Sequence, residues 1–325
     1  MGNQKTLHGR RRPAKRPAPK PALAALRVRR AAATAAGPYE PGAVPAPLPH
    51  FASGLFAAQF SHGLALARPV LAAAYTAPSS LTSLRKDGYL VIPGAIHPHL
   101  LRLIEASSLA RAKGQDRPVT AQGRVRCALP CRLAVATPAL DLLYDAMAAM
   151  GFPARELEQV YEGRQRYSLH LEGLLVHRGL KGYPASEQQP LHTDLCEQRF
   201  PAKVCAGGGR MGMALSMLIP AIGAASGSYV AGSHLRGPGS EEGLGLPVPV
   251  SVPAGAVLVF HPQLAHFGGS GSALPANVAQ RAALFMSASH PQAYSGRVPS
   301  RSLVLGGQRW QVVHFGGSEY NNALR

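Results

Sequence analysis

The chain has 325 residues, enough for one well-buried domain with extensions, and it carries a formal net charge of +18. No apolar run reaches the roughly 18 to 20 residues that a membrane-spanning helix needs, which argues against a transmembrane segment. The four cysteines have neither a secretory signal beside them nor the spacing of a zinc site, and this predicts reduced intracellular thiols.

The positive charge is concentrated at the start of the chain. Residues 1–39 hold ten of the 34 Lys and Arg residues and no Asp or Glu, and the stretch that follows to about Pro78 is rich in Ala and Pro. Because this composition offers few large apolar side chains, we expect residues 1–78 to form a disordered basic tail.

Four interpretations of this tail stay open. It resembles an organelle transit peptide, for the mitochondrion or plastid, in its Arg and Ala content without acids. The basic run at residues 10–20 also fits a nuclear-import or nucleic-acid patch, and residues 1–6 fit a loose myristoylation pattern. The fourth interpretation is a tail without any such role. We therefore expect an intracellular protein, in an organelle or the nucleus.

After the tail, the pattern is that of a β-rich sandwich or barrel. Short apolar runs separated by Gly-, Pro- and Ser-rich turns predict strands at residues 89–92, 171–176, 211–219, 256–260 and 282–286. Apolar residues at three- and four-residue steps predict helices at residues 98–112 and 138–150. A strand-like segment follows at residues 310–315.

His192 and Asp194 lie two residues apart in a short polar stretch at residues 188–194, outside these apolar runs. On an extended strand their side chains point the same way, so both can bind one ion while Thr193 faces elsewhere. His266, far downstream, supplies a third ligand type, and two imidazoles with one carboxylate form the facial triad that holds non-haem Fe(II). Such a triad leaves three positions for a bidentate 2-oxo acid and O2.

Arg281 is a candidate anchor for the far end of such an acid, because a guanidinium binds a carboxylate through two parallel hydrogen bonds. A loop rich in Gly and Ser separates His266 from Arg281. This arrangement fits two adjacent antiparallel strands.

Two other pairs compete for a metal. His170 and Glu172 lie in an apolar run, where they either ligate metal or face the barrel mouth or solvent as ordinary polar residues. His97 and His99 have the spacing of a cupin metal site, but their segment reads as the start of an amphipathic helix.

Several segments resemble the phytanoyl-CoA dioxygenase-like family of Fe(II)/2-oxoglutarate-dependent oxygenases. They are the Asp-Gly-Tyr strand with its helix, the metal strand, the strand pair that ends in Gly-Ser-His, the last ligand strand and the Arg strand, at residues 84–105, 189–194, 217–235, 252–266 and 281–287. The resemblance implies a mainly β fold with flanking helices, a double-stranded β-helix (jelly-roll or cupin-like barrel). It places a dioxygenase domain at residues 79–292 and a C-terminal extension at residues 293–325.

The resemblance also assigns roles. It makes His192, Asp194 and His266 the catalytic iron ligands and pairs Arg281 with the distal carboxylate of 2-oxoglutarate. Members often have a hydroxyl residue two positions after the arginine, but this chain has Ala283. A second co-substrate contact must then come from elsewhere, and the candidates are Gln189, Thr193, Tyr167 and Ser287.

Asp194 bears on the chemistry, because related halogenases lack this carboxylate and bind a halide in its place. Its presence predicts hydroxylation of a C–H bond of a small or lipid-like organic substrate, with release of succinate and CO2. An oxygenase acting on nucleic acid or protein is an alternative, with nucleic acid reached through the basic tail only, and a non-catalytic cupin-like binding module is another. His234, in the Gly-Ser-His segment, is expected to be structural rather than part of the pocket rim.

Overall fold

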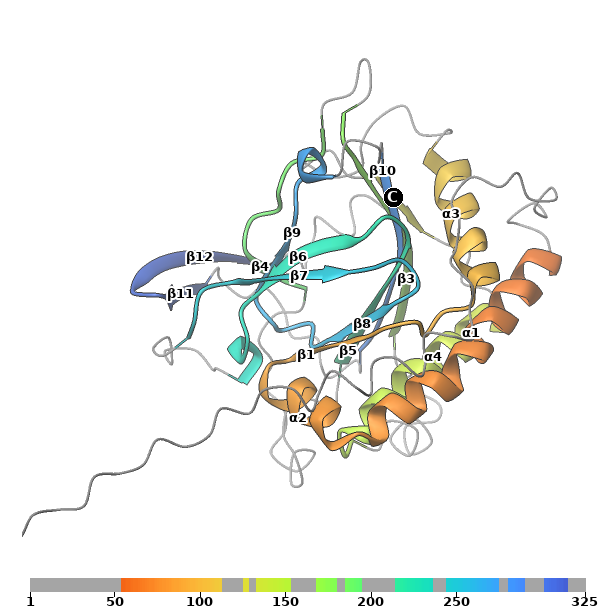
Figure 1. Ribbon diagram of the computed structural model, residues 1–325, viewed down its shortest axis with the longest axis horizontal. Helices are drawn as coiled ribbons and strands as arrows, with labels where there is room; N and C mark the ends of the chain where they lie inside the picture. Colours follow the sequence, from red (N-terminus) through yellow and green to blue (C-terminus); the bar gives the residue numbers. More distant parts are fainter. Residues whose placement is uncertain are drawn as a thin grey trace, which may run out of the picture. The chain divides into compact units, whose positions relative to one another are not determined.

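Two six-stranded sheets face each other in the part of the chain that the structure describes (Figure 1). The computed structural model describes residues 54–112, 125–128, 133–152, 168–179, 185–194, 214–235, 244–274, 280–289 and 301–314. The first sheet has the order β1 (Tyr89–Ile92), β8 (Val257–Phe260), β5 (Ala214–Ile222), β10 (Gln280–Ser289), β3 (Ser168–His177) and β2 (Val125–Ala128). The second has the order β11 (Arg301–Leu305), β12 (Gln308–His314), β4 (His192–Thr193), β9 (His266–Gly268), β6 (Ala225–Tyr229) and β7 (Val248–Val252).

The path of the chain between the sheets defines the fold class. From β3 to β10 the chain passes back and forth between the two sheets. β3, β5, β8 and β10 belong to the first sheet, and β4, β6, β7 and β9 belong to the second. The consecutive strands β6 and β7 pair antiparallel within the second sheet. Two antiparallel sheets wound in this way form a double-stranded β-helix, or jelly roll. The predicted fold class is therefore confirmed.

The first sheet is buried on both faces, which explains why its strands are nearly continuous apolar runs. On β10, Leu284 and Met286 pack into the core beneath the helices, whereas Phe285 belongs to the apolar cluster between the sheets. The alternation follows from the two-residue period of a strand. The five apolar runs predicted as strands are found as β1, β3, β5, β8 and β10.

Helices cover the outer face of the first sheet, on the side away from the second sheet (Figure 1). The helix predicted at residues 98–112 is α3 (Pro98–Ala112), with the same bounds. The other predicted helix is α4 (Leu133–Ala149), which begins five residues before the predicted start at Pro138. Pro138 lies in the second turn, where the missing N–H removes one backbone hydrogen bond but leaves the helix unbroken.

The expectation of a tail without a core up to Pro78 is wrong for its last part. Residues Gly54–Thr76 form α1, followed by α2 (Pro78–Lys86). Phe60, Leu64 and Leu71 of α1 are at most 1% exposed. They lie at helical spacing, so a few large residues in an Ala-rich segment suffice to make a buried stripe. Composition alone hid this periodicity.

An ion pair also joins α1 to the rest of the helical layer. Arg68 donates from Nη2 to Asp145 of α4 at 3.0 Å. None of the helices in the described ranges is long and apolar enough to cross a membrane. The targeting, nucleic-acid and myristoylation interpretations concern residues 1–53, which lie outside the described residues.

The segment predicted as a C-terminal extension joins the second sheet. β11 and β12 form a hairpin, and β12 pairs in parallel with β4, the strand that carries His192. The strand predicted at residues 310–315 is thus found as β12, with residue 315 outside the described residues. This hairpin extends the sheet at the edge where β4 would otherwise end it.

Candidate metal centre

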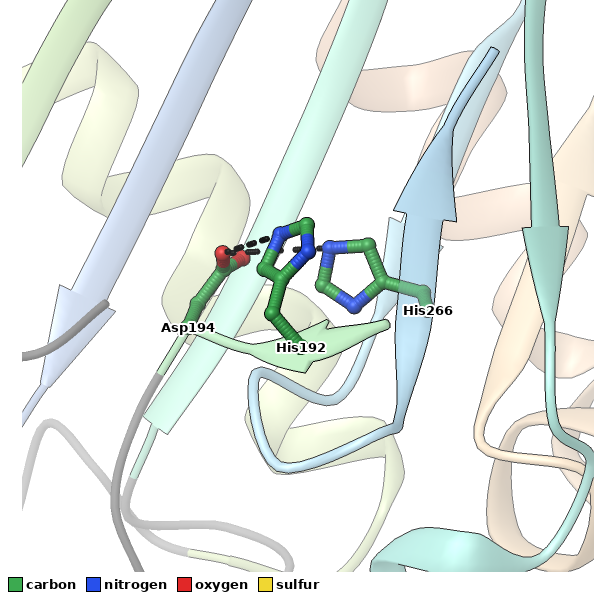
Figure 2. A group of neighbouring side chains, drawn as sticks. All are labelled: His192, Asp194 and His266. Atoms are coloured by element: carbon green, nitrogen blue, oxygen red, sulfur yellow. Dashed lines mark ion pairs between the residues drawn. The ribbon is translucent and has the colours of Figure 1, made fainter. Parts of the chain in front are cut away.

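Two strands of the second sheet and one short loop bring His192, Asp194 and His266 together. β4 pairs with β9 so that His192 lies directly opposite His266. Asp194 follows β4, and its backbone N–H donates to the carbonyl of Pro262 at 2.9 Å. The three residues that the sequence singled out therefore form one cluster, and Figure 2 shows their side chains converging from the two strands.

The spacing of the cluster suits a single ion. Asp194 Oδ1 lies 3.7 Å from His192 Nε2 and 3.8 Å from His266 Nε2. All three ligand atoms lie within 4.8 Å of one another. Atoms bound to one small divalent ion at about 2.0–2.2 Å each have separations of this order.

Both imidazoles are held in the tautomer that a metal requires. His192 Nδ1 lies 2.9 Å from the carbonyl oxygen of Pro190, and His266 Nδ1 lies 2.8 Å from that of Leu264. A carbonyl oxygen only accepts, so Nδ1 carries the proton in each ring and Nε2 keeps its lone pair. Backbone carbonyls in this role are a recurrent feature behind metal-binding histidines.

The carboxylate completes the donor set. Asp194 Oδ2 is buried and has no hydrogen-bond partner among the described residues. An acceptor in that position is costly unless something binds it. Two neutral imidazoles and one carboxylate fit non-haem Fe(II), so His192, Asp194 and His266 are suited to hold that ion.

Aromatic side chains that the sequence analysis missed fix the ring of His266. Tyr229 lies opposite His266 in the β6–β9 register and stacks on it, with ring centroids 5.5 Å apart and an interplanar angle of 9°. Phe260 meets the same imidazole edge-on at 5.2 Å. The Gly-Ser-Tyr run before Gly-Ser-His was visible in the sequence, but the register that sets Tyr229 against His266 was not.

A small apolar cluster supports β4 from the other side. Leu191, directly before His192, packs with Leu303 and Leu305 of β11, with Val230 and with Ala265, which precedes His266. A strand of two residues has few interactions of its own. We infer that the β11–β12 hairpin holds the metal strand in place.

A hollow of about 760 Å³ of empty space, including its opening to solvent, lies beside the cluster. Its lining includes His192, Asp194, His266 and Arg281. Apolar side chains from β3, β5, β8 and β10 form most of the remaining wall, namely Leu174, Val176, Leu218, Phe260, Ala283 and Phe285. The metal cluster and Arg281 thus share one cavity between the sheets.

Arg281 is a buried cation within this hollow. It is 5% exposed, and Nη1 donates to Ser226 Oγ at 3.1 Å and to the Ala224 carbonyl at 3.4 Å. Burial lowers the pKa of its guanidinium to about 10, and the neighbouring Tyr229 offsets part of the shift. The side chain is still charged at neutral pH, yet no carboxylate among the described residues pairs with it. An anion in the hollow would supply the missing partner.

The candidates for a second co-substrate contact separate clearly. Gln189 lines the hollow, and its Oε1 accepts from the Gly268 N–H at 3.0 Å, which leaves its NH2 group as a donor. Thr193 is buried but does not line the hollow. Ser287 also lies off the lining and accepts a hydrogen bond from Ser216 at 3.2 Å. Tyr167 lies outside the described residues.

The competing histidines lie elsewhere. His97 precedes α3 and its Nδ1 accepts from the backbone N–H of His99 at 3.2 Å, as expected for a helix start. His234 is buried in a short 3-10 helix (Ser233–Leu235), where burial lowers its pKa to about 4. Its neighbour Ser233 accepts from the Ala265 N–H at 2.8 Å, so this segment supports the chain beside His266. His170 and Glu172 bind each other at 2.7 Å, outside the cluster of three.

Comparisons with other proteins add little to this geometry. No protein-family model and no curated protein sequence matches the chain. Among solved structures, the non-haem α-ketoglutarate-dependent carbocyclase SnoK from nogalamycin biosynthesis is 15% identical, with 66% of this chain and 83% of that chain covered and a TM-score of 0.47. The epimerase SnoN from the same biosynthesis is 19% identical, with 67% and 83% covered and a TM-score of 0.46.

HygX from Streptomyces hygroscopicus, solved with nickel and 2-oxoglutarate bound, is 18% identical, with 66% and 87% covered and a TM-score of 0.41. With TM-scores under 0.5, these similarities carry no argument about the activity of this chain.

Proposed function

We propose that this protein is an Fe(II)- and 2-oxoglutarate-dependent dioxygenase that hydroxylates a C–H bond of a small organic substrate. The observation that carries the proposal is one hollow that holds both a His-Asp-His cluster and a buried arginine without a carboxylate partner among the described residues. Metal ligands alone would fit many proteins. The added cation explains why a dianionic co-substrate would bind beside them.

The chain's own residues would divide the work as follows. His192, Asp194 and His266 would hold Fe(II) and occupy one side of its coordination sphere. Arg281 would bind the distal carboxylate of 2-oxoglutarate, and Ser226 would fix the orientation of the guanidinium. The NH2 group of Gln189 is the candidate for a further contact, since Ala283 offers no hydrogen bond.

The apolar wall would exclude water from the reaction. Leu174, Leu218, Phe260 and Phe285 give the hollow a dry lining around its few polar groups. Bound iron supplies the oxidative chemistry, in which O2 and 2-oxoglutarate give succinate and CO2 and one oxygen atom enters the substrate. Asp194 favours hydroxylation over halogenation because it fills the position that a halide would need. These features agree with the phytanoyl-CoA dioxygenase-like type suggested by the motifs.

An anaerobic titration of the full chain with Fe(II) and 2-oxoglutarate tests the proposal. We expect a visible charge-transfer absorption when both are present, and its loss in His192→Ala and Asp194→Ala. His99→Ala is the matched control, because His99 lies on α3 and outside the cluster. Absence of the absorption in the wild type, with metal binding unchanged in both triad variants, would overturn the proposal.

A further inference from the structure

Tyr229 lines the hollow, and its hydroxyl group has no part in the stacking contact with His266. The residue belongs to β6, it is 5% exposed, and its ring lies 5.5 Å from the imidazole. A phenyl ring would stack equally well, and the same wall contains two, those of Phe260 and Phe285. Among the benzene-type rings of the described lining, only that of Tyr229 carries a hydroxyl, so the position of this group matters.

The ring of Tyr229 is held from several sides. Besides His266, it contacts Tyr89 of β1, with centroids 5.4 Å apart, and the edge of Phe260 of β8 at 5.9 Å. These neighbours belong to both sheets. Close packing between fixed strands leaves the ring little freedom to move. The hydroxyl is therefore presented at one place in the hollow.

Gly227 shows where that place is. It lies two residues before Tyr229 on β6, so both face the same side of the strand. A Cβ added to Gly227 would lie 3.2 Å from Tyr229 Cε2 and 3.3 Å from the hydroxyl oxygen. The ring therefore extends back along β6 past the bare Cα of Gly227, and both residues line the hollow. The hydroxyl points away from His266 and toward the start of the strand.

Arg281 is held at the same end of β6. Its Nη1 donates to Ser226 Oγ and to the Ala224 carbonyl. Burial lowers the pKa of Arg281 to about 10, and Tyr229 acts in the opposite direction by favouring the charged guanidinium. An electrostatic effect of this kind weakens with distance, so the two side chains are close. Tyr229 thus extends from the metal ligand His266 toward the buried cation.

A 2-oxo diacid requires recognition at these two places. Its 2-oxo acid group would bind the metal beside His266, and its distal carboxylate would pair with Arg281. Arg281 alone does not use all the hydrogen-bonding capacity of that group, because two carboxylate oxygens offer about four acceptor sites. A phenol beside the cation is a suitable further donor, whereas Ala283 offers none.

Other contacts of the Tyr229 hydroxyl do not prevent this role. A phenol both donates and accepts hydrogen bonds, so a group that donates to its oxygen leaves its proton available. Hydrogen bonds to an ionised carboxylate are also roughly twice as strong as those between neutral groups. A carboxylate that binds at Arg281 would therefore draw the hydroxyl proton away from a neutral acceptor.

We propose that Tyr229 is a specificity-determining residue for the co-substrate, and that its hydroxyl donates to the distal carboxylate that Arg281 binds. The inference rests on the proposed oxygenase function and adds a residue to its co-substrate site. The consequence is a preference for 2-oxo acids that carry a second carboxylate over those that end in an apolar group. The stacking of the ring on His266 is a separate contribution, because it does not involve the hydroxyl.

Two acids that share a five-carbon 2-oxo chain test the proposal. 2-Oxoglutarate has the distal carboxylate, whereas 2-oxopentanoate ends in a methyl group. Anaerobic titration of the full chain with Fe(II) gives both affinities from the visible absorption of the complex. Calorimetry with Zn(II) in place of Fe(II) gives them a second time. Neither measurement depends on turnover.

Tyr229→Phe keeps the ring and removes only the hydroxyl. We expect the affinity for 2-oxoglutarate to fall roughly tenfold or more, the usual weight of a hydrogen bond to a charged group. The affinities for 2-oxopentanoate and for the metal should stay unchanged. Tyr75→Phe is the matched control, because Tyr75 is a buried tyrosine of α1 that does not line the hollow, and it should change neither acid.

The two proposals fail separately. Equal losses of affinity for both acids in Tyr229→Phe would reduce Tyr229 to a support of the metal centre. Unchanged affinity for 2-oxoglutarate would exclude the hydroxyl contact. Either result overturns the inference and leaves the oxygenase function standing. If the wild-type protein forms no complex with Fe(II) and 2-oxoglutarate, the oxygenase function is wrong and the inference falls with it.

Discussion

Replacing Arg281 by Met should move stability and co-substrate binding in opposite directions. The pKa of the guanidinium falls from 12.5 to about 10 because the group is buried. At about 1.4 kcal/mol per pKa unit, keeping this charge in the folded protein costs about 3 kcal/mol. The group is charged in both the folded and unfolded states at pH 7, so the whole cost is present there, and only a rise in pH through about 10 would relieve it.

Hydrogen bonds made by the guanidinium offset part of this free-energy cost. Nη1 donates to Ser226 and to the Ala224 carbonyl, and each such bond contributes about 1 kcal/mol. Without ligands, Arg281→Met should therefore raise the free energy of unfolding by about 1 kcal/mol. With Fe(II) present, loss of two charge-assisted bonds to 2-oxoglutarate should weaken its binding at least about 100-fold.

Urea unfolding of the ligand-free protein and anaerobic 2-oxoglutarate titration measure the two effects. Arg68→Met is the control, since Arg68 is half-exposed and pairs with Asp145 of α4. It should lose up to about 1 kcal/mol of stability and leave 2-oxoglutarate affinity unchanged. If Arg281→Met lost stability as Arg68→Met does and kept its affinity for 2-oxoglutarate, Arg281 would not be the residue that binds the 2-oxoglutarate carboxylate.

Three further predictions test other parts of the structure. Leu64→Ala in α1 should lower the free energy of unfolding by about 2–5 kcal/mol, whereas Leu66→Ala, at a position 46% exposed, should change it by less than about 0.5 kcal/mol; equal urea midpoints would show that α1 does not belong to the core. Burial lowers the pKa of His234 from 6.5 to about 4, although Asp87 and the backbone of Arg85 oppose this shift. The protein should therefore have its full stability above pH 6.5, where His234 is neutral in both the folded and unfolded states, and should lose up to about 3 kcal/mol of it as the pH falls toward 4. Unfolding curves at several pH values should show this loss in the wild type and not in His234→Gln, and parallel pH profiles would contradict it. Leu305→Ala, in the cluster behind β4, should lower stability by about 2–4 kcal/mol and weaken Fe(II) binding; lower stability with unchanged metal affinity would refute the supporting role of the β11–β12 hairpin.

Much of the metal centre could be anticipated because its logic is local. On an extended strand the two-residue spacing of His192 and Asp194 puts both side chains on the same face, and in the structure both belong to the metal cluster. The expectation that His266 and Arg281 lie on adjacent antiparallel strands is wrong, because β9 belongs to the second sheet and β10 to the first. Both residues nevertheless line the same hollow between the sheets. Thr193, which the same alternation directs elsewhere, is buried and does not line the hollow.

Features that depend on register or on packing were less accessible. The aromatic rings that hold His266 come from β6 and β8, and nothing local in the sequence sets Tyr229 against that imidazole. The sequence did not decide whether His170 and Glu172 face the inside or the outside of the barrel, because β3 is apolar on both sides and its periodicity is weak. α1 was missed for a related reason, since its large residues are few and only their spacing marks the buried stripe.

Iron X-ray absorption of the Fe(II)-loaded protein with 2-oxoglutarate tests the central claim most directly. The proposed site predicts two imidazole ligands and further oxygen ligands at about 2.0–2.2 Å. His266→Ala should leave one imidazole and lower the iron occupancy, while His99→Ala should leave the spectrum unchanged. An iron environment that is the same in wild type and His266→Ala would contradict a metal centre built from His192, Asp194 and His266.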